Sequence, residues 1–186
     1  FGMGYFEHET TYRGIRVNRH VIAPYGDIPA LIADVEIENL GGAPVELQYY
    51  EYWDVNIQQL QLQWLRSGAF GPSSDSVRRG LNRFFIPSVE WDEDASALRF
   101  RQQIRQPRPQ SAPPPDQPSE IDWDPANVFL ADLDGAQAAV YVNKMTFFGK
   151  GGARQPDAVV QRRPGDTLPR DNRNDPMPYC FAIRRD

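Results

Sequence analysis

The sequence predicts an all-β protein, built as an antiparallel β-sandwich. Three observations lead to this prediction. Apolar side chains recur at every second residue in several short segments, as they do in strands with one buried face. Glycine and proline separate these segments where turns are needed. No stretch has the longer apolar period of a convincing amphipathic helix, so we expect sheets that pack face to face.

Residues 5–22 predict a β-hairpin with its turn at Arg13 and Gly14, because glycine readily takes the positive φ of a tight turn. If Tyr12 pairs with Ile15, cross-strand partners share a face and the side chains separate by polarity. The apolar face then holds Phe6, Tyr12, Ile15, Val17 and Val21, and the polar face holds Glu7, Glu9, Thr11, Arg16, Asn18 and His20. A slip of one residue would destroy this separation.

The rest of the chain continues the pattern of short strands and turns. Further strands are expected at residues 30–39, 45–55, 57–65, 81–91, 96–104, 126–133 and 137–148. The glutamines of 57–65 also permit a helix, but its apolar residues have period two. Residues 68–76 and 162–178 read as loops. Residues 106–118 hold six of the 17 prolines, which cannot donate hydrogen bonds within a sheet, so we expect an exposed insertion loop inside a single domain spanning 1–186.

Bulk composition narrows the class of protein. A net charge of −5 argues against general affinity for nucleic acid or an anionic membrane, and no apolar run is long enough to span a bilayer. The single cysteine, Cys180, forms no internal disulfide and fits a reducing compartment, so we expect a cytoplasmic protein. Both ends look cut, since the chain begins at Phe1 and stops within an apolar alternation. We therefore expect a fragment of a longer protein.

The run from Gly149 to Gly152, with Lys150 inside it, looks at first like a phosphate-binding loop. Such a loop needs a Ser or Thr directly after its lysine and a helix that follows. Neither requirement is met, because Gly151 follows Lys150 and Pro156 interrupts a helix. The pattern instead predicts a strand that ends at Phe148, with Phe147 and Phe148 on opposite faces, and then a tight loop.

Trp-Asp pairs at 53–54, 91–92 and 123–124 suggest carbohydrate recognition, because an aromatic ring can stack on a sugar while a carboxylate accepts its hydroxyl protons. Their spacings of 38 and 32 residues, without a Gly-His pair, do not fit a propeller repeat. For any single tryptophan, packing in the core or at a sheet edge is the simpler interpretation. The candidate sugar-binding residues are Trp53, Tyr50, Asp54 and Trp123.

No group of residues in the sequence clearly predicts a catalytic or metal-binding site. His8 and His20 fall on opposite faces of the predicted hairpin, and the chain has too few Cys and His for a zinc site, so no metal is expected. A Cys180–His8 thiol pair lacks a third group. The carboxylates that could serve a glycosidase are Glu51, Asp54, Glu90, Asp92, Glu93 and Asp94, although 90–94 reads as an acidic turn. The arginine pairs at 162–163 and 184–185 read as solvated surface.

Several stretches together resemble the amino-terminal β-sandwich of inverting glycoside phosphorylases, glycoside hydrolase family 94. This family includes cellobiose, cellodextrin and chitobiose phosphorylases and the phosphorylase region of cyclic β-1,2-glucan synthases. The matching elements occur in the family's order, apart from residues 65–125, where no match is clear. They are Gly2-x-Gly4-Tyr5, Gly14-Ile15-Arg16, Val21 to Pro24, Glu38-Asn39, Tyr50 to Trp53, Phe147 to Gly152 with Pro156, and the stretch 175–183. The proline-rich insertion and Lys150, where arginine is usual, depart from the pattern.

The resemblance implies an antiparallel β-supersandwich of the galactose mutarotase-like type, here truncated, beside an (α/α)6 barrel of the same protein. That barrel would hold the general acid and the groups that bind inorganic phosphate, so no catalytic residue and no cofactor is assigned to this chain. The expected partners are carbohydrate, the barrel domain and a second copy of the protein in a homodimer. Two alternatives stay open. One is a free-standing carbohydrate-binding or structural module, and the other is a self-contained glycosidase that uses Glu51 and Asp54.

Overall fold

The protein is mainly β. The computed structural model describes residues 4–55, 85–104, 126–135, 137–171 and 179–186. Of these described residues, 50% are in strands and 10% in helices, and the strands form three antiparallel sheets, which confirms the predicted dominance of antiparallel strands. The predicted elements at 57–65, 68–76 and 106–118 lie outside the described residues. None of the described helices is long and apolar enough to cross a membrane.

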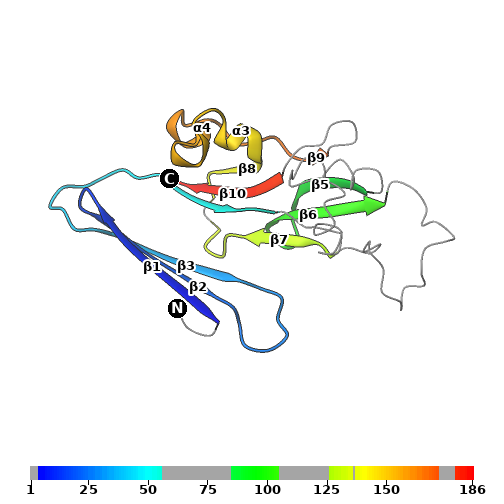
Figure 1. Ribbon diagram of the computed structural model, residues 1–186, viewed down its shortest axis with the longest axis horizontal. Coiled ribbons are helices and arrows are strands. Elements are labelled where there is room, and N and C mark those ends of the chain that lie inside the picture. Colours follow the sequence, from blue (N-terminus) through cyan, green and yellow to red (C-terminus); the bar gives the residue numbers. More distant parts are fainter. Residues whose placement is uncertain (1–3, 56–84, 105–125, 136, 172–178) are drawn as a thin grey trace, which may run out of the picture. The chain divides into compact units, whose positions relative to one another are not determined.

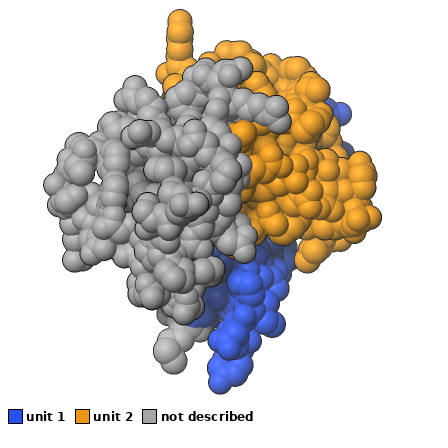
Figure 2. Space-filling model, turned by 90° about the vertical axis from the view of Figure 1, so that its right-hand side faces the viewer, with its two compact units in different colours: residues 1–47 blue, residues 48–186 orange. Residues whose placement is uncertain are grey.

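The chain divides into two compact units, residues 1–47 and residues 48–186, coloured separately in Figure 2. Each is a continuous stretch of sequence. The prediction of one domain over the whole chain stays a prediction, and each unit is described by itself.

Unit 1 is a sheet of three strands in the order β1-β2-β3. Its strands are β1 (Tyr5–Tyr12), β2 (Ile15–Ile22) and β3 (Ile32–Asn39). The first hairpin has the predicted register, with Tyr12 opposite Ile15 and Phe6 opposite Val21. Arg13 and Gly14 both have positive φ, 50° and 80°, as a two-residue turn that matches the strand twist requires. The hairpin prediction is therefore confirmed in turn and register.

Strand β3 extends both faces of this hairpin. Val17 lies opposite Ile37 and Val21 opposite Ala33, so the apolar face continues across the sheet. On the polar face, Arg16 forms an ion pair with Glu38. None of the described residues in unit 1 is buried. The sheet therefore has one apolar face without a core of its own.

Unit 2 contains the other two sheets (Figure 1). One has the order β4-β10-β8 and the other the order β7-β6-β5-β9. Their strands are β4 (Tyr49–Trp53), β5 (Phe85–Asp92), β6 (Ala97–Ile104), β7 (Val128–Ala131), β8 (Ala139–Asn143), β9 (Arg170–Asp171) and β10 (Tyr179–Arg185). The β5–β6 hairpin turns at residues 93–96. The predicted acidic turn at 90–94 is thus shifted, because Glu90 and Asp92 belong to β5 and pair with β6.

The two sheets of unit 2 share one hydrophobic core. Buried side chains from both sheets form a single cluster, which comprises Val89, Leu98, Phe100, Val142, Tyr179, Phe181 and Ile183. Phe181 is 1% exposed, and burying a side chain of that size contributes about 1.5–3 kcal/mol. The cluster thus joins the two antiparallel sheets of unit 2 through their apolar side chains.

Two short helices cover the opposite face of the β4-β10-β8 sheet (Figure 1). They are α3 (Lys144–Phe148) and α4 (Asp157–Val160), joined through a 3₁₀ turn, η1 (Gly152–Arg154). The predicted strand 137–148 is therefore wrong beyond Asn143. The Asn143 side chain accepts hydrogen bonds from the backbone N–H of Met145, at 3.0 Å, and of Thr146, at 3.2 Å, and starts the helix.

Candidate functional site

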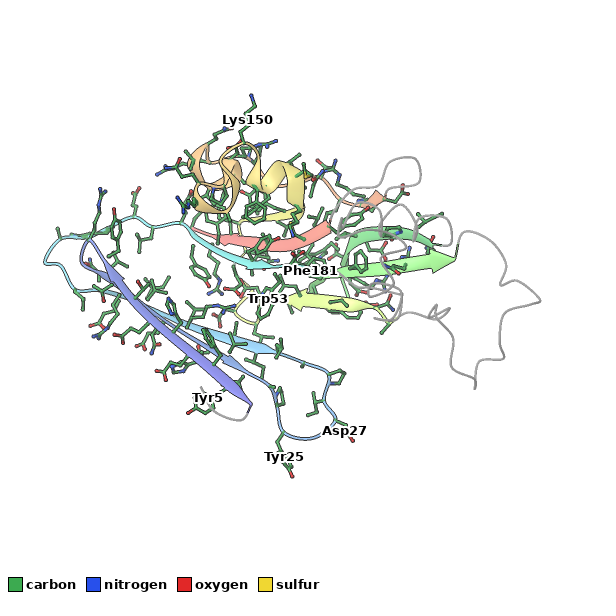
Figure 3. The ribbon with its side chains drawn as sticks, in the orientation of Figure 1. Tyr5, Tyr25, Asp27, Trp53, Lys150 and Phe181 are labelled. Atoms are coloured by element: carbon green, nitrogen blue, oxygen red, sulfur yellow. The ribbon has the colours of Figure 1, made fainter. Side chains whose placement is uncertain are left out.

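The candidate sugar-binding residues are not brought together. Trp53 packs against the core between the two sheets of unit 2 and lies opposite Phe181 in the register (Figure 3). Tyr50 packs against the cluster on the other face of the sheet, under the helices. Because they occupy opposite faces of β4, Tyr50 and Trp53 cannot hold one sugar ring between them. Trp123 lies outside the described residues.

Tyr50 belongs to an aromatic cluster beneath α3. Ring centroids lie 5.9 Å apart for Tyr50 and Tyr141, 5.3 Å for Tyr52 and Phe147, and 5.0 Å for Tyr52 and Phe148. Phe147 is 2% exposed and touches the other rings. These rings contact one another, so their arrangement fits packing of the helices onto the sheet rather than stacking on a sugar.

Asp54 lies at the edge of this cluster. It follows β4 and forms an ion pair with Lys144, the first residue of α3. The neighbouring Tyr52 hydroxyl is buried and has no hydrogen-bond partner in the described part of the chain. Burial raises the pKa of Tyr52, and the nearby Cys180 and Asp54 raise it further. Asp54 thus faces Lys144 at the start of α3.

The glycine-rich run forms a tight loop, as predicted, and its backbone amides hold an internal carboxylate. The N–H of Lys150 donates to one Asp157 oxygen at 3.2 Å, and the N–H of Gly151 donates to the other at 3.3 Å. In a phosphate-binding loop such amides hold the anion, whereas here they hold Asp157. Pro156 does not prevent a helix, because it directly precedes α4 and occupies its N-cap position.

The outer side of the helical layer carries positive charge. Figure 3 shows Lys150 pointing away from the sheets of unit 2. Arg154 and Arg162 are also exposed, and Arg163 donates a hydrogen bond to the backbone oxygen of Thr146 at 3.0 Å. The loop therefore presents cations to solvent while its only carboxylate, Asp157, is turned inward.

The carboxylates proposed for a glycosidase mostly have partners of their own. Glu51 is 8% exposed and accepts a hydrogen bond from the Tyr49 hydroxyl. Glu90 and Asp92 both pair with Arg99, and the hydrogen bond to Glu90 raises the pKa of that guanidinium. The exposed residues Glu93 and Asp94 lie in the turn after β5. These contacts stabilise the sheets, and none of them identifies a general acid.

Cys180 is not placed as a nucleophile. It is fully buried, and this burial, with the nearby Asp166 and Asp54, raises the pKa of its thiol to about 12. A catalytic thiolate requires the opposite shift. His8 is exposed on unit 1, where its ring stacks on Phe6 at 6.4 Å. His20 faces Glu7, with 3.0 Å between their side chains.

Two structural residues were missed by reading the sequence. Arg185, expected at the solvated surface, donates two hydrogen bonds to Asp132, at 2.7 and 2.8 Å, and so joins β10 to the end of β7. The Asp166 carboxylate accepts hydrogen bonds from the N–H groups of Val142, at 2.8 Å, and Asn143, at 3.1 Å, and covers the outer edge of β8. No local pattern marks either residue, because both act across long separations in the chain.

Taken together, the fold and these contacts define a mainly β protein with several antiparallel sheets. No protein-family model matches the chain, and a comparison with curated protein sequences finds no match. Among the described residues, no three His, Cys, Asp or Glu side chains are grouped as a metal ion would require.

Proposed function

We propose that this chain is the non-catalytic β-supersandwich region of a carbohydrate-active enzyme, an inverting glycoside phosphorylase. The observation that carries the proposal is the element from Phe147 to Pro156, which is also part of the sequence resemblance. Its residue types fit the loop that it forms. Phe147 anchors α3 on the sheet, Gly149 ends the helix with a φ of 55°, and Gly151 leaves room for the backbone of Gln155.

The contacts of the carboxylates in unit 2 favour a structural role for this chain rather than a catalytic one. Inverting phosphorolysis needs a general acid on the leaving oxygen while phosphate attacks the anomeric carbon on the opposite side. Two of the candidate carboxylates of unit 2, Glu90 and Asp54, are engaged in ion pairs with Arg99 and Lys144. In the proposed enzyme the acid and the phosphate site belong to a helical barrel, and the loop at 149–157 is a fixed surface beside it.

The reaction is tested on the natural protein that contains this chain. A β-linked disaccharide and inorganic phosphate are supplied, and the products are followed by phosphorus and proton NMR. The expected products are a free sugar and a sugar 1-phosphate with inverted anomeric configuration. Cleavage that proceeds equally well without phosphate would contradict the proposal and favour the glycosidase that uses Glu51 and Asp54.

A binding experiment on the 186-residue chain distinguishes the phosphorylase region from a free-standing carbohydrate-binding module. Calorimetric titration with β-linked oligosaccharides is run on the chain and on the Trp53→Phe variant, which keeps an aromatic ring in the core. If the chain is a non-catalytic region of a larger enzyme, we expect it to bind these oligosaccharides weakly or not at all. Tight binding by the chain, with no phosphorolysis by the natural protein, would favour the module and end the phosphorylase proposal.

A further inference from the structure

Strand β3 is the last strand of its sheet among the described residues. Its inner side pairs with β2 along all eight residues, from Ile32 opposite Ile22 to Asn39 opposite Ile15. Within the described ranges, no strand pairs with its outer side. An edge strand of this length presents a row of backbone N–H and C=O groups that can accept a further strand.

This edge is acidic on one face and apolar on the other. Asp34, Glu36 and Glu38 alternate with Ala33, Val35 and Ile37. Opposite the three carboxylates, β2 places His20, Asn18 and Arg16, of which Arg16 forms an ion pair with Glu38. The edge therefore carries more negative than positive charge, in a regular two-residue spacing.

Elsewhere the chain covers a sheet edge with its own backbone. At β8, the N–H of Asp166 donates to the Val140 oxygen at 2.8 Å, and the Asp166 side chain accepts from two further amides. Gly165 approaches so closely that an added Cβ would lie 2.8 Å from the same Val140 oxygen. No such covering segment is found at β3 within the residues that the structure describes.

A second copy of β3 is a poor partner for this edge. In an antiparallel pair, directly opposite residues share a face, so a register that keeps the apolar faces together places carboxylate opposite carboxylate. Shifting the register by one residue removes this repulsion but turns the apolar face of one copy toward the polar face of the other. Strand β1 offers a less acidic edge, because it carries two carboxylates, Glu7 and Glu9, whereas β3 carries three.

We propose that the outer edge of β3 binds an extended, basic segment of another polypeptide as an added strand. Main-chain hydrogen bonds supply the pairing. Lysine or arginine at alternate positions faces Asp34, Glu36 and Glu38, and the apolar residues between them continue the apolar face of unit 1.

The test uses the 186-residue chain and a short fluorescent peptide that alternates lysine and valine. Fluorescence anisotropy measures binding, and hydrogen exchange locates it. We expect saturable binding and slower exchange of amides in residues 32–39. A peptide with the same charges but N-methyl groups on alternate residues should bind about tenfold more weakly, because it cannot pair along one edge.

Two matched variants separate this edge from general attraction to an acidic sheet. Asp34→Asn with Glu36→Gln should weaken binding about tenfold, whereas Glu7→Gln with Glu9→Gln, which removes the same charge from β1, should change it less than about threefold. Equal binding of the N-methylated peptide would overturn the proposal, as would equal loss in both variants. Outer-edge amides of β3 that are already protected without peptide would also overturn it.

Discussion

The carboxylate of Asp157 occupies the space that a side chain on Gly149 would need. A Cβ placed on Gly149 would lie 2.0 Å from one oxygen of Asp157. The same carboxylate accepts the hydrogen bonds from Lys150 and Gly151. The run of glycines after the two phenylalanines therefore makes room for an anion that the chain itself supplies.

We predict that Gly151→Ala destabilises the protein, although Gly151 has an ordinary φ of −73°. The new Cβ would lie 1.9 Å from the backbone oxygen of Gln155, so the loop would have to move. The free energy of unfolding in urea should fall by about 1–3 kcal/mol. Gly42→Ala is the control, because a Cβ at that residue would meet no atom within 4 Å. Similar losses in the two variants would contradict this account of the loop.

We predict unequal roles for the two neighbouring phenylalanines. Phe147 is 2% exposed within the aromatic cluster, so Phe147→Ala should lower the free energy of unfolding by about 3–5 kcal/mol. Phe148 is only partly buried, and Phe148→Ala should cost less than about 2 kcal/mol. Denaturant unfolding followed by near-ultraviolet circular dichroism measures both. A larger loss at Phe148 than at Phe147 would contradict this account of the aromatic cluster.

The ion pair between Asp132 and Arg185 should contribute more to the stability of the fold than the ion pair between Asp134 and Arg185. The Asp132 side chain is 7% exposed and that of Asp134 is 78% exposed, although both accept hydrogen bonds from Arg185. Asp132→Ala should lower stability by about 1.5–3 kcal/mol, and Asp134→Ala by less than about 1 kcal/mol. Thermal unfolding at low and high salt distinguishes them, since salt screens the exposed pair more strongly. Equal losses of stability in the two variants would show that burial of Asp132 does not strengthen its hydrogen bonds to Arg185.

Alkaline pH should destabilise unit 2 through Cys180. Burial raises the pKa of this thiol from 9.0 to about 12. Above pH 9 the unfolded chain loses the thiol proton while the folded chain keeps it, so stability falls as pH rises, by up to about 1.4 kcal/mol per pH unit. Tyrosines in the unfolded chain titrate near 10.0 and contribute to the same window, so the effect of Cys180 is isolated by comparison with a variant that lacks the thiol.

The control for this prediction is Cys180→Ala. Its free energy of unfolding should decline less between pH 9 and pH 10 than that of the parent protein, whatever its value at neutral pH. Identical slopes would show that the thiol is not protected by the fold. The buried Tyr179, whose pKa is also raised by its burial, should add to the decline at higher pH.

Sequence reasoning succeeded where the pairing partners are neighbours in the chain. The register of the first hairpin followed from the turn at Arg13 and Gly14 and from the polarity of the two faces. It failed at α3, because residues 137–148 are apolar enough for a strand. The signal that could have corrected it is Asn143, a good N-cap, with Gly149 six residues later as a helix end.

Part of the candidate site could also have been read correctly from spacing alone. Tyr50 and Trp53 are three residues apart in a strand, which places them on opposite faces. The contacts of Asp157, Asp166 and Asp132 could not be predicted, because each depends on how distant segments meet in three dimensions. The same is true of the sheet order, since the pairing of β10 with β4 leaves no local trace in either strand.

Strand β10 lies in the middle of its sheet, between β4 and β8, which do not pair with each other. During synthesis on the ribosome, the first two strands of this sheet emerge well before the one that joins them. They must wait, with apolar surface uncovered, until Tyr179–Arg185 have left the exit tunnel. The nascent chain should therefore need chaperone protection from the time β4 emerges until β10 has left the exit tunnel.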